Sequence, residues 1–278
     1  MERTAATIKV GDLDIGYTQM GAGPDLVLVH GGFADRRMWG DLPERLAGAY
    51  RVTTYDLRGH GETGPSGYAV YSGDVFAKDL VGLLDALGIA RAHLLGLSLG
   101  GIVAQHVAAG HGDRVERLVL GSTMVRHDLT AMDRAATYFP FISPSLTLRA
   151  LGPIPFARAS LAIIRAARGK GWMSVNPETR EFLIQLASEM SRAEYVKVLR
   201  AVYRNEGVDL SRIAAPTLVL TGEAETETLD THADHLAREI AGAERAVVAG
   251  AGHIMNLDAP DLFASIVTRF LRGDALSP

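Results

Sequence analysis

The stretch Gly96-Leu97-Ser98-Leu99-Gly100 decides the expected fold, because it places one serine between two glycines where the local pattern changes. Apolar residues at 93–97 predict a buried strand, and apolar residues at helical spacing predict a helix over 99–109. A serine at such a strand-to-helix turn sits in a strained backbone conformation, and the glycines let neighbouring chain segments pass close to it. We expect the Ser98 hydroxyl to be exposed above a sheet, as a nucleophile must be.

Short apolar runs alternate with helical patterns on both sides of this turn, which is typical of a mostly parallel sheet covered by helices. The expected helices are 72–87, 99–109, 230–240 and 261–271. The expected strands are 7–10, 13–19, 26–30, 51–55, 93–97, 117–120, 217–220 and 245–248. The sequence therefore predicts an α/β fold.

Residues 124–209 interrupt the alternation with helical patterns broken by prolines. Residues 124–208 carry 12 Lys and Arg against 7 Asp and Glu, whereas the whole chain has a net charge of −4. We expect one core domain, residues 1–123 and 210–278, with residues 124–209 inserted between two strands of its sheet.

The composition excludes several classes of function. With 28 Lys and Arg against 32 Asp and Glu, the chain has no general attraction for phosphate backbones, so nucleic acid is not an expected partner. The absence of cysteine removes disulfides, thiolate metal sites and cysteine nucleophiles. The chain starts without a signal-peptide pattern and contains no apolar run long enough for a transmembrane segment, so we expect a cytoplasmic protein.

His232 and His235 are three residues apart on a predicted helix and could face one metal ion. No set of acidic partners surrounds them, so a solvated helix face is the expected interpretation. We expect no metal and no organic cofactor.

Two backbone amides are candidates for stabilising a developing oxyanion. The amide of Leu99 opens the predicted helix, where N–H groups lack partners and the helix dipole is positive. His30-Gly31-Gly32-Phe33 follows another predicted strand, and its glycines let the Gly32 amide approach a substrate carbonyl. Phe33 is expected to form a wall of the pocket.

The chain resembles the α/β-hydrolase family, whose motifs it carries in the family's order: His30-Gly31-Gly32, Asp56-x-Arg58-Gly59-x-Gly61, Gly96-x-Ser98-x-Gly100-Gly101 and Gly250-Ala251-Gly252-His253. The resemblance extends from about residue 8 to residue 271. It implies the α/β-hydrolase fold, with a mostly parallel eight-stranded sheet flanked by helices and residues 124–209 as a helical cap over the active site. It also implies that the loop with Asp56 and Arg58 is a structural brace.

The resemblance makes His253 the expected general base, because the family's catalytic histidine lies in this loop after the last strand. Glycines in the loop allow the imidazole to reach Ser98. The alternative is that His253 only caps the following helix. His30 and His60 are more typical of residues that brace loops around a pocket.

The acid is where the sequence departs from the family's pattern. The family usually has a glycine after the strand at 217–220 and an aspartate three residues later, whereas Gly222 is followed by Glu225 here. Glutamate is longer by one methylene, but it can still orient the imidazole and stabilise its protonated form. Glu223 and Glu227 on the same loop are alternatives, as is a solvated acidic run without a catalytic role.

Aromatic residues of the insertion are expected to line a substrate pocket together with Phe33 and Ile254; they include Tyr138, Phe139 and Trp172. The insertion also carries several basic residues: Arg149, Arg158, Arg165, Arg168 and Lys170. They would attract an anionic substrate, an acyl carrier or an anionic membrane surface. The alternative is that they form a solvated basic face.

The expected function is a serine hydrolase that cleaves a small carboxylic ester or lactone through an acyl-enzyme, using Ser98, His253 and Glu225. The residues from Gly96 to Gln105 are similar to enol-lactonase-like members of the family. A C–C bond hydrolase is an alternative, although such enzymes usually follow the catalytic histidine with Trp rather than Ile254. A ligand sensor with little or no turnover is the alternative from another class.

Overall fold

The computed structural model describes residues 3–131, 152, 154–155, 158–159, 162 and 172–275. Eight strands form one sheet: β1 (Arg3–Val10), β2 (Leu13–Met20), β3 (Asp25–Val29), β4 (Arg51–Tyr55), β5 (Ala92–Leu97), β6 (Val115–Gly121), β7 (Thr217–Gly222) and β8 (Glu244–Val248). Their order across the sheet is β1-β2-β4-β3-β5-β6-β7-β8. β2 is antiparallel to β1 and β4, and every other neighbouring pair is parallel.

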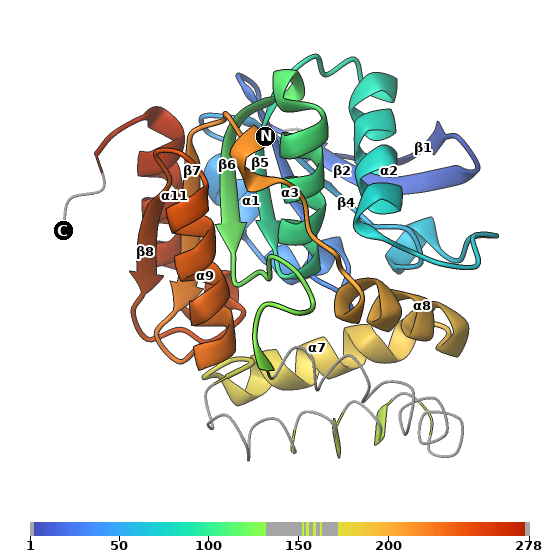
Figure 1. Ribbon diagram of the computed structural model, residues 1–278. Helices are drawn as coiled ribbons and strands as arrows, with labels where there is room; N and C mark the ends of the chain where they lie inside the picture. Colours follow the sequence, from blue (N-terminus) through green and yellow to red (C-terminus); the bar gives the residue numbers. More distant parts are fainter. Residues whose placement is uncertain are drawn as a thin grey trace.

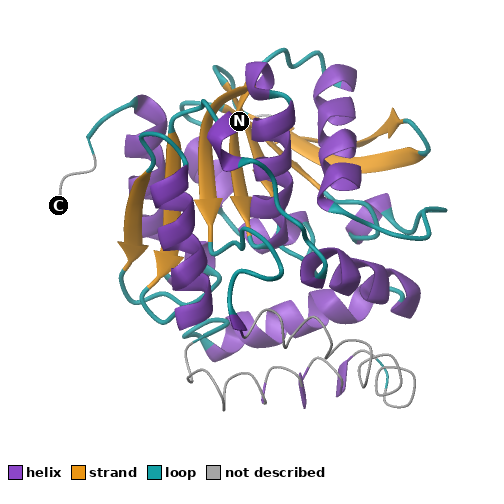
Figure 2. Cartoon of the chain, in the orientation of Figure 1, coloured by secondary structure: helices purple, strands orange, loops and turns teal. Residues whose placement is uncertain are grey.

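Helices cover both faces of this sheet (Figures 1 and 2). One core of buried apolar side chains lies under α2 (Gly73–Ala86), α3 (Leu99–Gly110) and α9 (Glu227–Glu239). A second core lies on the other face, under α1 (Leu42–Leu46), α10 (Met255–Asp258) and α11 (Pro260–Arg272). Short 3-10 helices complete the connections: η1 (Arg36–Trp39), η2 (Gly61–Thr63), η3 (Gly112–Arg114) and η4 (Leu210–Arg212).

The predicted α/β-hydrolase fold is confirmed, with its eight-stranded, mostly parallel sheet. The largest difference in a strand boundary is at β1, which begins at Arg3 rather than at residue 7. β1 is an edge strand that pairs only with β2. Backbone hydrogen bonds to β2 place its first residues in the sheet, so these residues do not need the apolar pattern on which the prediction relied. The sequence also missed the five-residue helix α1, which is too short for a helical period to stand out.

Residues between β6 and β7 form α7 (Pro177–Glu189) and α8 (Arg192–Tyr203) in the described part of the insertion. Figure 1 shows both helices beyond the carboxyl ends of β5 and β6. The side chains of Asn176 and Ser191 cap their first turns by accepting hydrogen bonds from backbone amides. Within the described ranges, no helix has the length and apolar character needed to cross a membrane.

The start of α3 lies directly against the end of β3, and glycine makes this approach possible. A Cβ atom at Gly100 would collide with the carbonyl oxygen of Val29, and one at Gly96 would collide with the carbonyl oxygen of Gly100. These obstacles are backbone atoms, which cannot rotate away as a side chain can. The two glycines that flank Ser98 are therefore required by packing.

We predict that Gly100→Ala lowers the free energy of unfolding by about 3 kcal/mol or more, because the added methyl forces α3 away from β3. Gly110→Ala is the matched control in the same helix, since a Cβ there meets no atom within 4 Å. The control is expected to be neutral or stabilising by up to about 1 kcal/mol. Urea unfolding of the three proteins measures both effects, and equal stability of Gly100→Ala and the wild type would contradict this packing.

Candidate active site

The predicted site residues follow four parallel strands at their carboxyl ends. Gly32 comes after β3, Ser98 after β5, Glu225 after β7 and His253 after β8. Because the carboxyl ends of parallel strands meet at the same edge of a sheet, these residues share one edge. This is the edge that α7 and α8 face in Figure 1.

Ser98 adopts φ 57° and ψ −117°, a strained conformation that a residue with a side chain seldom takes. Its amide donates to the carbonyl oxygen of Gly121 at 2.9 Å. Its own carbonyl oxygen accepts from the Thr123 hydroxyl at 2.7 Å. The backbone of Ser98 is thus fixed on both sides, and its side chain is only partly buried.

Two unpaired amides lie beside each other near Ser98. The Gly31 amide donates to the Met38 sulfur at 3.1 Å, and the Phe33 amide donates to His60 Nε2 at 3.3 Å. Within the described ranges, the Gly32 amide between them and the Leu99 amide have no acceptor. A Cβ on Gly32 would lie 3.6 Å from the Leu99 Cβ, so the two residues are neighbours. Free N–H groups at the start of a helix are suited to an anion.

His30 and His60 are fully buried behind this loop and hold it in place. Both Nε2 atoms accept backbone N–H groups, from Leu57 at 2.9 Å and from Phe33. Both Nδ1 atoms therefore donate, to the carbonyl oxygens of Gly31 at 2.7 Å and Arg58 at 2.9 Å. Burial lowers the pKa of His30 to about 4 and that of His60 to about 3. Neither ring is free to act as a base.

His253 lies against Glu225, with 2.8 Å between Nδ1 and Oε2. The other two candidate acids do not reach the imidazole: Glu223 accepts from the Gly250 amide at 2.8 Å, and the exposed Glu227 begins α9. Of the three glutamates on this loop, Glu225 is the one that the structure brings to His253.

The Glu225 side chain is fully buried and still held as a carboxylate. Burial by itself would raise the pKa of Glu225, but the adjacent His253 and the Thr226 amide lower it below its usual range. A carboxylate only accepts, so His253 must donate its Nδ1 proton to Glu225. His253 Nε2 is then left as the acceptor, which is the form a general base requires. Within the described part of the chain, the Ser98 hydroxyl makes no hydrogen bond.

Two residues of the insertion contact the Gly32–Phe33 loop, and the sequence did not single them out. The Tyr195 ring stacks on Phe33 with 4.3 Å between centroids and 26° between planes. Val198 Cγ1 lies 3.4 Å from where a Cβ on Gly32 would be. Both lie on the buried face of α8, so apolar spacing was a signal for a buried face but carried no information about its partner.

The other predicted pocket residues have different surroundings. The Trp172 ring lies beside the His253 ring, with 5.7 Å between centroids. Ile254 is 5% exposed and belongs to the core on the α11 side. Tyr138, Phe139, Arg149, Arg165, Arg168 and Lys170 lie outside the described residues. Arg158 is exposed and paired with Glu181 at 2.7 Å.

Asp56 and Arg58 form separate ion pairs rather than one with each other. Asp56 pairs with Arg36, and Arg58 pairs with Asp79 at 2.6 Å and with Asp12. This loop links β1, β2, η1 and α2, in agreement with the brace that the resemblance implies.

No metal site emerges from the part of the chain that the structure describes, where no three His, Asp or Glu side chains converge. His232 is buried and its Nδ1 accepts the Val125 amide at 3.1 Å, so the expectation that it faces solvent was wrong. The His232 side chain is buried because α9 packs against residue 125 of the insertion. The residues next to His232 in the sequence give no sign of this contact.

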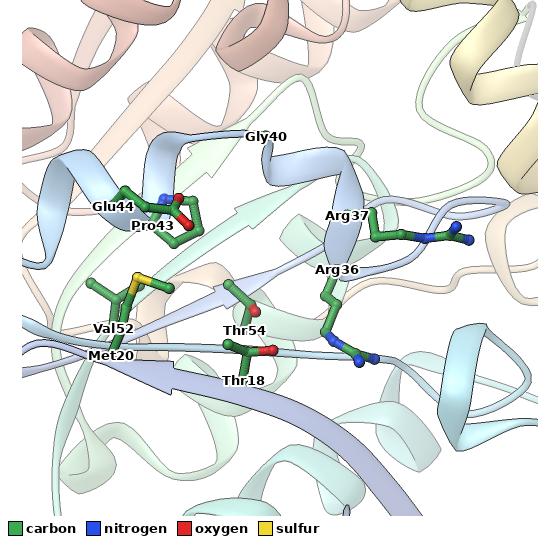
Figure 3. Close-up of a pocket in the computed structure, with 9 residues that line it drawn as sticks. All are labelled: Thr18, Met20, Arg36, Arg37, Gly40, Pro43, Glu44, Val52 and Thr54. Atoms are coloured by element: carbon green, nitrogen blue, oxygen red, sulfur yellow. The ribbon is translucent and has the colours of Figure 1, made fainter. Parts of the chain in front are cut away.

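A separate cavity of about 250 Å³ lies between η1, α1 and the strands β2 and β4 (Figure 3). Thr18 and Thr54 line it on the sheet side, and none of the predicted site residues takes part. Arg36 and Arg37 extend away from Glu44 in Figure 3, and both are paired with acidic residues elsewhere.

Residues 26–266 match the sequence model of the alpha/beta hydrolase family. The chain belongs to this family. As an α/β hydrolase it is similar over nearly its full length to two solved enzymes. An enol-lactonase from Burkholderia xenovorans has a TM-score of 0.80 at 26% identity, covering 96% of this chain and 99% of that chain. A thermophilic esterase from Thermogutta terrifontis has a TM-score of 0.81 at 27% identity, covering 98% and 99%.

The chain is also similar in sequence to a curated lactonase. The 3-oxoadipate enol-lactonase 1 of Acinetobacter baylyi is 25% identical over 256 residues, which is 90% of this chain and 89% of that protein.

We predict that His60 makes this α/β hydrolase less stable in acid. The unfolded state binds a proton at His60 below its usual pKa of 6.5, whereas burial in the folded state lowers that pKa to about 3. The unfolded state therefore binds more protons between these values, and stability falls as the pH drops from about 6.5 towards 4.

His60→Gln keeps a hydrogen-bond acceptor and a donor but does not titrate. We expect it to reduce the change of the free energy of unfolding with pH by up to about 1.4 kcal/mol per pH unit. Urea midpoints between pH 7 and 4.5 measure the slope, and the exposed His111→Gln is the control with the wild-type slope. A wild-type slope in His60→Gln would show that His60 is not held neutral.

Proposed function

We propose that the chain is a serine hydrolase that cleaves a carboxylic ester or lactone through an acyl-enzyme. The observation that carries this proposal is the 2.8 Å hydrogen bond from His253 to the buried Glu225, at the sheet edge that also holds Ser98. The esterase and enol-lactonase relatives support an ester-hydrolysing reaction.

His253 Nε2 takes the proton of the Ser98 hydroxyl as the serine oxygen attacks the substrate carbonyl carbon. The Ser98–His253 hydrogen bond that this needs is often long in a resting enzyme and tightens when substrate binds. The amides of Gly32 and Leu99 donate to the oxyanion of the tetrahedral intermediate. Glu225 holds the imidazole in the required tautomer and stabilises its protonated form.

His253 then gives its proton to the leaving alkoxide, and the acyl group stays on Ser98. Water attacks this ester with His253 again as the base, which releases the carboxylic acid and restores the serine. In a lactone the leaving alkoxide belongs to the same molecule as the acyl group, so the product is a single hydroxy acid.

The insertion, residues 124–209, acts in this proposal as a cap that shapes the substrate pocket. Phe33 and Tyr195 supply stacked aromatic rings next to Gly32, and Trp172 lies beside His253. Tyr138 and Phe139 remain predicted pocket residues. These apolar walls favour an uncharged acyl group, because a charge would lose its hydration against them.

We predict that wild-type protein repeatedly hydrolyses p-nitrophenyl esters or small lactones, and that Ser98→Ala reduces the rate to background. Glu225→Gln is expected to lower kcat by about 10²- to 10⁴-fold, because the amide neither fixes the imidazole tautomer nor stabilises its charge. Exposed Glu227→Gln, two residues away, is the matched control and should stay within about twofold of wild type. Steady-state rates over acetate to decanoate esters and a lactone panel measure these effects.

A single stoichiometric burst, or wild-type activity in Ser98→Ala, would contradict the proposed function. The first result would favour a ligand sensor, and the second would move the reaction away from Ser98.

A further inference from the structure

Asp258, the last residue of α10, gathers three hydrogen-bond donors on one carboxylate. Its Oδ2 accepts from the Gly252 amide at 2.8 Å and from the Val175 amide at 3.0 Å. Its Oδ1 accepts from the Ser174 hydroxyl. Gly252 directly precedes His253, whereas Ser174 and Val175 belong to the insertion, so one carboxylate joins two segments that lie far apart in the sequence.

Backbone hydrogen bonds continue the same contact along the His253 loop. The His253 amide donates to the Trp172 carbonyl oxygen at 2.7 Å, and the Ile254 amide donates to the Met173 carbonyl oxygen at 3.1 Å. We call residues 172–175 the return segment; they are the part of the insertion that leads into α7. The return segment therefore runs beside residues 252–254.

The return segment also restrains the imidazole of His253 directly. Among the described residues, Glu225 is the hydrogen-bond partner of the ring, at Nδ1, so the tilt of the ring about its Cβ–Cγ bond also depends on what packs against the ring. The Trp172 ring lies 5.7 Å away at 42° and limits that rotation from one side of the imidazole. The direction in which Nε2 points thus depends on where the return segment lies.

We propose that Asp258 is a positioning residue, which aligns His253 for catalysis by fastening the return segment along the His253 loop. This inference rests on the proposed function, since it concerns the base of that reaction. Without the carboxylate, the amides of Gly252 and Val175 lose their acceptor, and the backbone hydrogen bonds from His253 and Ile254 hold Trp172 less firmly beside the imidazole. The Glu225–His253 hydrogen bond remains, but Nε2 points to Ser98 for a smaller fraction of the time.

Asp258→Ala is expected to lower kcat about 10- to 100-fold, because a displacement of about 1 Å in a reacting group can cost 10²-fold. KM should change by less than about threefold, since the Gly32 and Phe33 side of the pocket stays intact. Asp258→Asn, which keeps one acceptor oxygen, should recover part of kcat, and Ser174→Ala, which removes one donor, should lose the least. Asp261→Ala is the matched control, because that carboxylate is 90% exposed and pairs only with Arg45 in the described structure.

Tryptophan fluorescence supplies a readout that does not depend on turnover. The chain has 2 tryptophans, and Trp39 is 0% exposed in the core, so new quenching by acrylamide reports on Trp172. We expect quenching to increase in the order wild type, Ser174→Ala, Asp258→Asn, Asp258→Ala, in step with the loss of kcat. Thermal unfolding ensures that each rate is measured on folded protein.

Three results would overturn the positioning role: a folded Asp258→Ala with kcat within twofold of wild type, a change in KM alone, or lost kcat with unchanged Trp172 quenching. If Asp258→Ala does not fold, Asp258→Asn and Ser174→Ala decide by the same criteria. If the wild-type protein shows no turnover, both the proposed function and the positioning role are wrong. If the wild-type protein is active and Asp258→Ala is equally active, only the positioning role is wrong.

Discussion

The close approach of Gly100 to the carbonyl oxygen of Val29 controls the geometry around Ser98. It allows the first turn of α3 to begin against the end of β3, with no side chain between them. Ser98 must then take a positive φ, which turns its side chain out of the strand and helix it joins. The same approach makes Leu99 a neighbour of Gly32, so two amides that have no acceptor among the described residues face one region. A single backbone contact thus determines where a nucleophile and an anion-stabilising pair can meet.

Burial has opposite consequences for the histidines and the acid of this edge. His30 and His60 are surrounded by backbone groups that engage both ring nitrogens, and burial keeps them neutral. Glu225 is equally buried, but His253 and the Thr226 amide donate to it and keep it ionised. Among the contacts of the described residues, His253 alone combines a carboxylate on one ring nitrogen with a second nitrogen that has no partner. Local hydrogen bonding, rather than the degree of burial alone, distinguishes the structural histidines His30 and His60 from the candidate base His253.

The insertion is fastened to both halves of the candidate site. On one side α8 places Tyr195 and Val198 against Phe33 and Gly32. The buried Glu194 strengthens this side, because it pairs with Lys197 at 2.7 Å and accepts from the Tyr71 hydroxyl of the core. On the other side the return segment runs beside His253. The elements that would select a substrate therefore also contact the groups that would act on it.

The sequence by itself determined the fold and the position of the candidate nucleophile. Alternating strands and helices identify a parallel sheet, and the glycines around Ser98 mark the turn, because both depend on residues adjacent in the chain. The spacing from Gly222 favoured Glu225 as the acid, with Glu223 and Glu227 as alternatives, since three flexible carboxylates lie within five residues of one loop. Tertiary structure distinguished them by turning Glu225 towards His253 and Glu223 towards Gly250.

Only tertiary structure could reveal Tyr195, Val198 and Asp258. The apolar spacing of α8 indicates that one face is buried, but the Gly32–Phe33 loop it covers is more than 150 residues earlier in the chain. In the sequence, Asp258 is an ordinary acidic residue shortly before the predicted helix 261–271, and only the folded chain brings Ser174, Val175 and Gly252 to it. Local pattern encodes the conformation of a segment and which face it buries, whereas the partner of that face is decided by how the whole chain packs.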